Sequence, residues 1–383
     1  MSVTTPKGFR AAGVTAGLKA SGRPDLALVV NDGPDHHAAA VFTGNRVEAA
    51  PVTWSRTVVA DGRADAVVLN SGGANACTGA PGFQDTHRTA EHVAAGLGLA
   101  PGDVVVCSTG LIGERLPMDL LLAGVDAAAA ALAADGGPAA AEAIMTTDTV
   151  AKTAVAQREG WSVGGMAKGA GMLAPALATM LVVVTTDAVA TPAALDAALR
   201  AATAETFDRV DSDGCMSTND TVVLLASGAS GSTPTADELT DAVTQVCADL
   251  ARQLVADAEG AHHDIAVEVR SAASVDDALE VARAVARNNL FKCAVFGNDP
   301  NWGRVLAAVG TTGAAFDPAS LDVAMNGVQV CRAGGVGEDR SLVDLAAREV
   351  SVVVDLHAGE ATATIWTNDL THDYVHENSA YST

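Results

Sequence analysis

The sequence predicts an α/β protein with mixed sheets. Short runs of β-branched and aliphatic residues alternate with loops rich in Gly and Asn, as buried strands do. Alanine- and leucine-rich segments with apolar residues at helical spacing lie between these runs. Hydrophobic residues make up 49% of the chain and charged residues 18%, which is typical of a soluble globular enzyme. With 383 residues, the chain is expected to form one composite core or two domains.

The amino-terminal part is expected to begin with strands and to continue with helices. Four apolar strands are predicted, at 26–30, 38–42, 66–69 and 104–107. The segment 116–134 has leucines at helical spacing in an alanine-rich background, which predicts a helix. Gly136-Gly137-Pro138 then interrupts the pattern before a second helix.

The carboxy-terminal part alternates strands with helices. The run Met-Leu-Val-Val-Val-Thr-Thr at 180–186 predicts a fully buried strand. Further strands are expected at 222–226 and 265–269, and helices at 192–203, 236–256 and 275–286. The helix 236–256 runs into Asp-Ala-Glu-Gly, where Gly260 would stop it. Two alternating strands, 350–355 and 361–367, face each other across residues 357–360 and predict a hairpin.

Charge and cysteine content exclude several classes of function. The formal net charge of −23 leaves no basic surface for nucleic acid or an anionic membrane. No apolar stretch approaches the ~20 residues of a spanning helix. The amino-terminal segment 1–13 has no apolar core, so no secretory signal is predicted. The six cysteines are scattered without a CxxC pair, which indicates reduced thiols in a cytoplasmic protein.

One threonine has the sequence context of a self-cleaving nucleophile. Thr179 follows Ala178 at the end of a loop rich in Gly and small residues, directly before the predicted buried strand. If the Ala178–Thr179 peptide is cut, Thr179 has both a hydroxyl nucleophile and a free α-amine. An α-amine titrates near pH ~8 and can act as general base for its own hydroxyl. Threonines before strands are common, however, and a purely structural role is the alternative.

Two other motifs give weaker signals. The glycine-rich segment 164–171 lacks the spacing of a phosphate-binding loop, so no nucleotide cofactor is predicted. Residues 211–220 carry alternating acids, but Gly214 is not at the sixth position and no Glu closes the loop at the twelfth, so a structural turn is predicted. The adjacent pairs His36-His37 and His262-His263 point to opposite faces of an extended chain. No metal site is therefore predicted.

A set of ordered motifs is similar to the signature of the glutamate N-acetyltransferase/ornithine acetyltransferase family, the arginine biosynthesis bifunctional proteins. The resemblance covers essentially the whole chain and rests on these segments: NSGGANACTG (70–79), CSTGLIGERLPMD (107–119), MTTDT (145–149), KGAGMLAPALATML (168–181), DSDGCMSTNDT (211–221), DAEGA (257–261), GNDPNWGR (297–304) and ENSAYST (377–383).

The resemblance implies both a fold and a reaction. The fold would be an α-β sandwich of the ornithine acetyltransferase/DmpA type, cleaved into an amino-terminal (alpha) chain 1–178 and a carboxy-terminal (beta) chain 179–383. Two alpha and two beta chains would form a heterotetramer. Acetyl would pass from N2-acetyl-L-ornithine to Thr179 and then to L-glutamate, without a cofactor. One subgroup also uses acetyl-CoA, and the residues here do not decide that point.

The site residues come partly from chemistry and partly from this resemblance. Ser108-Thr109-Gly110 offers hydroxyl and backbone donors at a strand end, and the resemblance assigns the oxyanion hole to Thr109 and Gly110. Lys168 is expected to anchor a carboxylate or the backbone. Glu259 lies at a helix end where the dipole disfavours an acid, which suggests a compensating cation such as the ornithine ammonium. The resemblance adds substrate contacts at Thr146, Asn378 and Thr383, with Thr147 not distinguished from Thr146 by local chemistry.

Two other functions fit the same residues. A self-processing aminopeptidase of related architecture would use the threonine chemistry with water as acceptor. An unprocessed amino-acid-binding protein would keep Thr179 as a structural residue. A denaturing gel separates the last alternative from the other two, because it predicts a single intact band.

Overall fold

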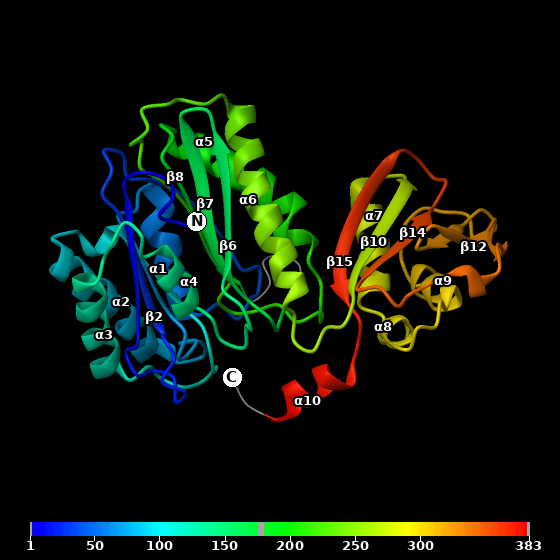
Figure 1. The fold of residues 1–383 in the computed structure, drawn as a ribbon, viewed down its shortest axis with the longest axis horizontal. Helices are drawn as coiled ribbons and strands as arrows, with labels where there is room; N and C mark the ends of the chain where they lie inside the picture. Colours follow the sequence, from blue (N-terminus) through cyan, green and yellow to red (C-terminus); the bar gives the residue numbers. More distant parts are fainter. Residues whose placement is uncertain (1, 175–179, 381–383) are drawn as a thin grey trace. The chain divides into compact units, whose positions relative to one another are not determined.

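The computed structural model describes residues 2–174 and 180–380, and these form two compact units (Figure 1). Unit 1 comprises residues within 1–208 and 215–257, and unit 2 comprises residues within 209–214 and 258–381. The predicted break between residues 178 and 179 therefore falls inside unit 1 rather than between the units. Among the described residues, no helix has both the length and the apolar character needed to cross a bilayer.

The first sheet of unit 1 has strand order β1-β2-β4-β5, and only the β4–β5 pair is parallel. Its strands are β1 (Phe9–Val14), β2 (Leu26–Asn31), β4 (Ala66–Asn70) and β5 (Val104–Ser108). One face packs on α2 and α3, with Leu28 and Val106 against Val93 and Leu121 in one apolar cluster. The helices of this half are α1 (Ala50–Val58), α2 (Gly79–Leu97), α3 (Met118–Ala130) and α4 (Gly137–Ala143).

The second sheet of unit 1 has strand order β3-β9-β8-β7-β6, and only the β8–β9 pair is parallel. Its strands are β3 (His37–Phe42), β6 (Lys152–Arg158), β7 (Trp161–Lys168), β8 (Leu181–Thr186) and β9 (Thr221–Ala226). Val183 and Val223 face the first sheet and share a core with Val29 and Val67. The two sheets therefore stack face to face, which confirms the predicted sandwich.

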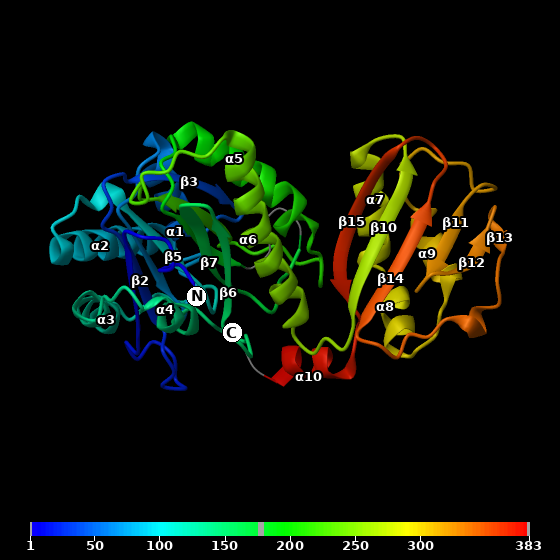
Figure 2. The ribbon, with the colours of Figure 1, turned by 45° about the horizontal axis from the view of Figure 1, so that its top comes forward.

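Helices cover the outer face of this second sheet. They are α5 (Pro192–Glu205) and α6 (Ala236–Ala256), and Figure 2 shows α6 running along β6 and β7. A Cβ on Gly165 of β7 would lie 2.8 Å from Val246 and 2.9 Å from Leu250, both on α6. The glycine-rich segment 164–171 thus begins inside a strand, where glycine permits close helix packing.

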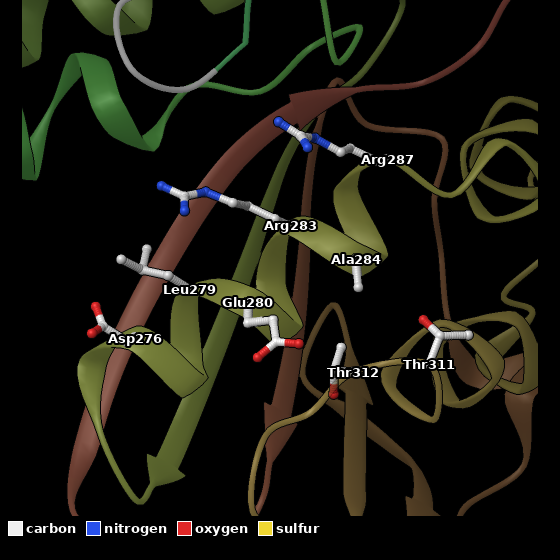
Figure 3. A pocket seen from close by; sticks show the side chains of 8 residues that line it. All are labelled: Asp276, Leu279, Glu280, Arg283, Ala284, Arg287, Thr311 and Thr312. Atoms are coloured by element: carbon white, nitrogen blue, oxygen red, sulfur yellow. The ribbon is translucent and has the colours of Figure 1, made fainter. Parts of the chain in front are cut away.

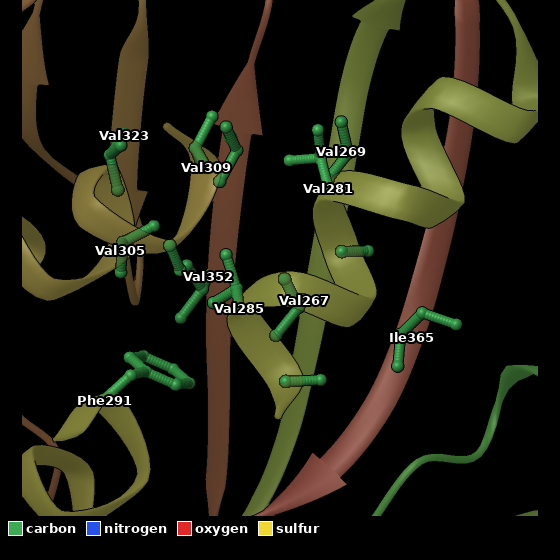
Figure 4. Packing of buried hydrophobic residues seen from close by; sticks show 14 of the residues in the cluster. Val267, Val269, Val281, Val285, Phe291, Val305, Val309, Val323, Val352 and Ile365 are labelled. Atoms are coloured by element: carbon green, nitrogen blue, oxygen red, sulfur yellow. The ribbon is translucent and has the colours of Figure 1, made fainter. Parts of the chain in front are cut away.

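Unit 2 is one six-stranded sheet with helices packed on it. The strand order is β13-β12-β11-β14-β10-β15. In Figure 4, Val281 and Val285 of α7 lie against the sheet residues Val267 and Val352 in one buried cluster. The elements are β10 (Asp264–Ala272), α7 (Val275–Ala286), α8 (Asn289–Phe296), α9 (Trp302–Val309), β11 (Asp322–Met325), β12 (Val328–Arg332), β13 (Gly335–Val336), β14 (Glu349–Asp355), β15 (Ala361–Asn368) and α10 (His372–Ala380).

The predicted hairpin of 350–355 with 361–367 is wrong. Both strands exist as β14 and β15, but β10 lies between them, parallel to β14 and antiparallel to β15. Alternating burial shows that one face of a strand is covered, but it does not identify the strand beside it. The predicted helix 116–134 is also shorter than expected, because α3 ends at Ala130 and Ala133 then forms a bridge with Ala11 of β1.

Candidate active site

The predicted oxyanion pair lies in a tightly bonded turn directly after β5. Thr109 donates its backbone N–H to Asn70 O at 2.9 Å, and its carbonyl accepts from Gly73 N at 3.0 Å. Gly110 has φ +130°, and a Cβ there would lie 2.7 Å from Gly73 N, so only glycine fits. Within the described residues, the N–H of Gly110 donates to no acceptor. The turn therefore presents one backbone N–H and one hydroxyl side by side.

Lys168 meets this turn from the second sheet. It is the last residue of β7 rather than part of a loop, it is only 2% exposed, and its Nζ lies 3.3 Å from Thr109 Oγ1. In the β7–β8 register, Lys168 is opposite Leu181, two residues beyond Thr179. Two residues predicted for separate roles, Lys168 and Thr109, are thus in contact beside the start of β8.

A buried network of charged side chains holds the backbone next to Lys168. Asp148 Oδ1 accepts from Lys152 Nζ and from Gly169 N, each at 2.7 Å, and its Oδ2 accepts from Thr146 N at 2.9 Å. Lys152 is fully buried and also bonds Asp257 at 2.5 Å. Burial acts to raise the pKa of Asp148, but the charges of Lys168 and Lys152 outweigh it and hold that pKa at about 2. The carboxylate is therefore ionised and fixes the backbone of Thr146.

Asp220 lies at the entry to β8 and was missed by the sequence reasoning. It is fully buried, its Oδ1 accepts from Met180 N at 3.0 Å, and among the described residues its Oδ2 has no hydrogen-bond partner. Burial raises the pKa of this carboxyl well above its usual value, against the opposing effects of the Met180 N–H and the Lys168 charge. Its only sequence signal was its place in the motif 211–221.

Three predicted residues lie outside the described ranges: Ala178, Thr179 and Thr383. The chain is described up to Ala174 and again from Met180. The nucleophile and the cleavage site thus remain predictions from the sequence, whereas Lys168, Asp220 and Met180 lie within the described residues.

Glu259 and Asn378 lie in unit 2. Burial and the charges of Glu259 and Asp373 raise the pKa of Glu377, so Glu259 lies near the acidic side chains of α10. A Cβ on Gly260 (φ +61°) would lie 2.2 Å from Tyr374 N, and Tyr374 O accepts from Asn378 Nδ2 at 3.0 Å. The turn at Gly260 and the helix α10 are therefore in contact within unit 2.

The helix-dipole argument for Glu259 is wrong. The helix α6 ends at Ala256, and Asp257 is the residue that caps it. The cation that compensates an acid at this helix end is Lys152, bonded to Asp257. Glu259 lies beyond this capping residue. The helix dipole therefore gives no reason to expect an ammonium group at Glu259, whereas the acidic side chains around it do.

A hollow of about 480 Å³ lies on unit 2 between α7 and the chain after α9. Figure 3 shows Glu280 reaching toward Thr312, with Arg283 and Arg287 further along α7. Glu280 accepts from Gly313 N at 2.7 Å, and Arg287 pairs with Asp211 at 2.7 Å. Asp211 belongs to the segment 211–220, which the sequence predicts to be a structural turn. No group of three or more metal-binding side chains occurs among residues 2–174 and 180–380.

Comparisons with known proteins agree on one family. The ArgJ family pattern matches residues 10–383. The arginine biosynthesis bifunctional protein ArgJ of Streptomyces coelicolor is 69% identical over 382 residues, covering 100% of both chains. The protein of the same name from Thermobifida fusca is 68% identical over 383 residues, also covering 100% of both. A crystal structure of ornithine acetyltransferase complexed with ornithine from Mycobacterium tuberculosis is 58% identical, with a TM-score of 0.45, and covers 47% of this chain and 96% of that chain.

Proposed function

This chain belongs to the ArgJ family and is an ornithine acetyltransferase of arginine biosynthesis, and we propose that it works through Thr179 as a covalent acetyl carrier. The Thr179 hydroxyl attacks the acetyl carbonyl of N2-acetyl-L-ornithine, and the α-amine of the same residue takes the hydroxyl proton. The C–N bond then breaks and ornithine leaves with that proton. The amine of L-glutamate attacks the acetyl-Thr179 ester and regenerates the hydroxyl.

The observation that carries this proposal is the pairing of Lys168 with the Thr109–Gly110 turn beside the start of β8. The Gly110 N–H has no acceptor among the described residues, and the Thr109 hydroxyl accepts from Lys168, so its own proton remains available to a ligand. Donors held by a fixed backbone stabilise the oxyanion of a tetrahedral intermediate without reorganising. Lys168 adds a positive charge next to that oxyanion.

Substrate recognition is divided between two sets of residues. Lys168 and Thr146 are proposed to hold the α-carboxylate and backbone atoms of the amino acid. Glu259, Asn378 and Thr383 are proposed to recognise the ornithine side chain. The support for Glu259 is the acidic neighbourhood that it shares with Glu377, because this neighbourhood suits an ammonium group.

We further infer that the chain cleaves itself between Ala178 and Thr179, giving an alpha chain 1–178 and a beta chain 179–383 in a heterotetramer of two alpha and two beta chains. The proposed location is the cytoplasm, which the scattered cysteines favour. Acetyl-CoA is proposed as a second acetyl donor, since the relatives are named as bifunctional proteins.

The test supplies acetylornithine without glutamate and measures the mass of each chain. We expect one added acetyl group on the chain that begins at Thr179, and parallel double-reciprocal lines when both substrates vary. Thr179→Ala should stay as one uncleaved chain and gain no acetyl group. Intersecting lines together with an unmodified beta chain would mean direct transfer in a ternary complex. Replacing acetylornithine with acetyl-CoA in the same assay tests the second donor.

A further inference from the structure

Lys19 is a cation at the edge of the candidate site to which neither the motifs nor the proposed mechanism gives a role. Its Nζ donates to Met145 O at 2.6 Å and to Pro24 O at 2.8 Å. An ammonium has three donors, so a third remains for another acceptor. Burial is the main cause that lowers the pKa of Lys19 to about 8. A half-buried ammonium that is held only by carbonyl groups favours an anion beside it.

One peptide group ties Lys19 to the proposed substrate contacts. The Met145–Thr146 peptide accepts from Lys19 through its oxygen and donates to Asp148 through its N–H. Asp148 also binds the N–H of Gly169, the residue after Lys168. The Met145–Thr146 peptide and Asp148 therefore link Lys19 to Gly169, the residue after Lys168, and the charge of Lys168 acts on Lys19.

The acids near Lys19 are already occupied. Asp25 accepts from the backbone N–H groups of Ala16, Leu18 and Lys19 itself, at 2.6 to 3.0 Å. Asp148 is bonded to Lys152, Gly169 and Thr146. The other charges acting on Lys19 are those of Arg23 and Lys168, both positive. Among residues 2–174 and 180–380, two cations lie near Lys19 and no carboxylate is bonded to its ammonium.

We propose that Lys19 binds the side-chain carboxylate of the acceptor glutamate and so selects glutamate over uncharged amino acids. Glutamate carries two carboxylates, whereas acetylornithine carries one, so the acceptor needs one more cation than the donor does. Lys168 serves the α-carboxylate shared by both substrates. This inference rests on the proposed function, in which glutamate enters the site after ornithine has left.

The test compares L-glutamate with L-glutamine as acceptors, because glutamine has nearly the same size and shape but carries an uncharged amide in place of the side-chain carboxylate. Lys19→Met removes the ammonium and keeps the unbranched side chain up to the Cε atom. We expect it to raise the KM for glutamate about tenfold or more, the usual effect of losing a hydrogen bond between charged groups. The KM for glutamine and the acetylation of Thr179 by acetylornithine should change less than about twofold. Lys19→Arg should restore part of the preference for glutamate.

The matched control is Arg23→Met, which removes an exposed positive charge from the same loop and should leave the preference for glutamate unchanged. If Lys19 only supported the Met145 carbonyl, Lys19→Met would impair both acceptors and the acetylornithine half-reaction alike, and that outcome overturns the inference. The preference is read from overall turnover. If Thr179 gains no acetyl group but the preference for glutamate still depends on Lys19, the covalent mechanism is rejected and the role of Lys19 is not.

The unmodified enzyme gives an independent measurement. The groups that set the charge of Lys19 are Asp25, Asp148, Arg23 and Lys168. As pH rises through about 8, Lys19 loses its proton, so the KM for glutamate should rise while the KM for glutamine stays level. If the KM values for glutamate and glutamine depend equally on pH, Lys19 is excluded as the group that binds the side-chain carboxylate of glutamate.

Discussion

The two units hold their candidate site residues in different ways. In unit 1, Lys168 and Lys152 are almost fully buried at strand ends, and the buried Asp148 in the loop before β6 bonds to Lys152 and to the Gly169 backbone. In unit 2, Glu259 lies in a turn and Asn378 on an exposed helix. Buried charges must be paired and fixed, because an unpaired one is costly. We infer that the candidate residues of unit 1 are rigidly held, whereas those of unit 2 tolerate substitution better.

The largest effect is expected from a substitution in the buried ion network of unit 1. Lys152→Met leaves Asp148 and Asp257 as buried acids without their cation, which typically costs about 3–5 kcal/mol of stability. Chemical denaturation of the variant and the wild type measures this difference. Lys7→Met, at an exposed position of unit 1, is the control and should change stability by less than about 0.5 kcal/mol. Equal stability of all three proteins would show that the network does not support the fold.

The second prediction concerns the oxyanion donors. Thr109→Ala removes one donor and the partner of Lys168, and such losses cost about 3 kcal/mol, or roughly a hundredfold or more in rate. Single-turnover acetylation of Thr179 measures the rate, and acetylornithine affinity should stay close to normal. Thr109→Ser keeps the hydroxyl and should retain most of the rate. If the alanine variant reacts at the wild-type rate, Thr109 is only a turn residue.

The third prediction follows from the pKa of Asp148. Its folded-state pKa, about 2, lies below the ordinary value of 3.8, so the ionised form stabilises the fold above pH 4. That contribution, about 2 kcal/mol, should disappear as pH falls from about 4 to about 2. Asp148→Asn should flatten this part of the stability profile. Denaturation midpoints of both proteins across that range provide the check, and parallel profiles would contradict the prediction.

The smallest effect is expected in unit 2. Glu259→Gln removes the charge proposed to attract the ornithine ammonium. Glu259 is only half-buried, and a pair that is open to solvent contributes only about 1 kcal/mol, or severalfold in KM. The KM for acetylornithine should rise more than the KM for glutamate. Glu349→Gln, an exposed acid of the same unit, should alter neither value. A large loss of turnover in Glu259→Gln would instead place Glu259 in the reaction centre and remove the contrast between the units.

Sequence reasoning found the site residues whose chemistry shows in a motif and missed those that act only through the fold. The Thr109–Gly110 turn was predicted through the family resemblance, because a hydroxyl and a glycine at a strand end by themselves are typical of an ordinary turn. Asp220 and Lys19 gave no such signal, since their roles depend on Met180 N and on the Met145 carbonyl, far away in the chain. For the same reason β14 and β15 were found as strands but paired incorrectly. Local pattern predicts burial, whereas partners come from tertiary structure.

The second sheet of unit 1 contains strands from both sides of the proposed cut, and this affects how the cleaved protein unfolds. Strands β3, β6 and β7 precede the proposed cut, and β8 and β9 follow it. In the order β3-β9-β8-β7-β6, the pairs β3–β9 and β8–β7 therefore join the alpha and beta chains by backbone hydrogen bonds. The mature chains cannot separate without losing this sheet. Unfolding after the cut also releases two chains from each alpha–beta pair instead of one, so its midpoint should depend on protein concentration. The uncut Thr179→Ala chain should show a weaker dependence, because it releases half as many chains.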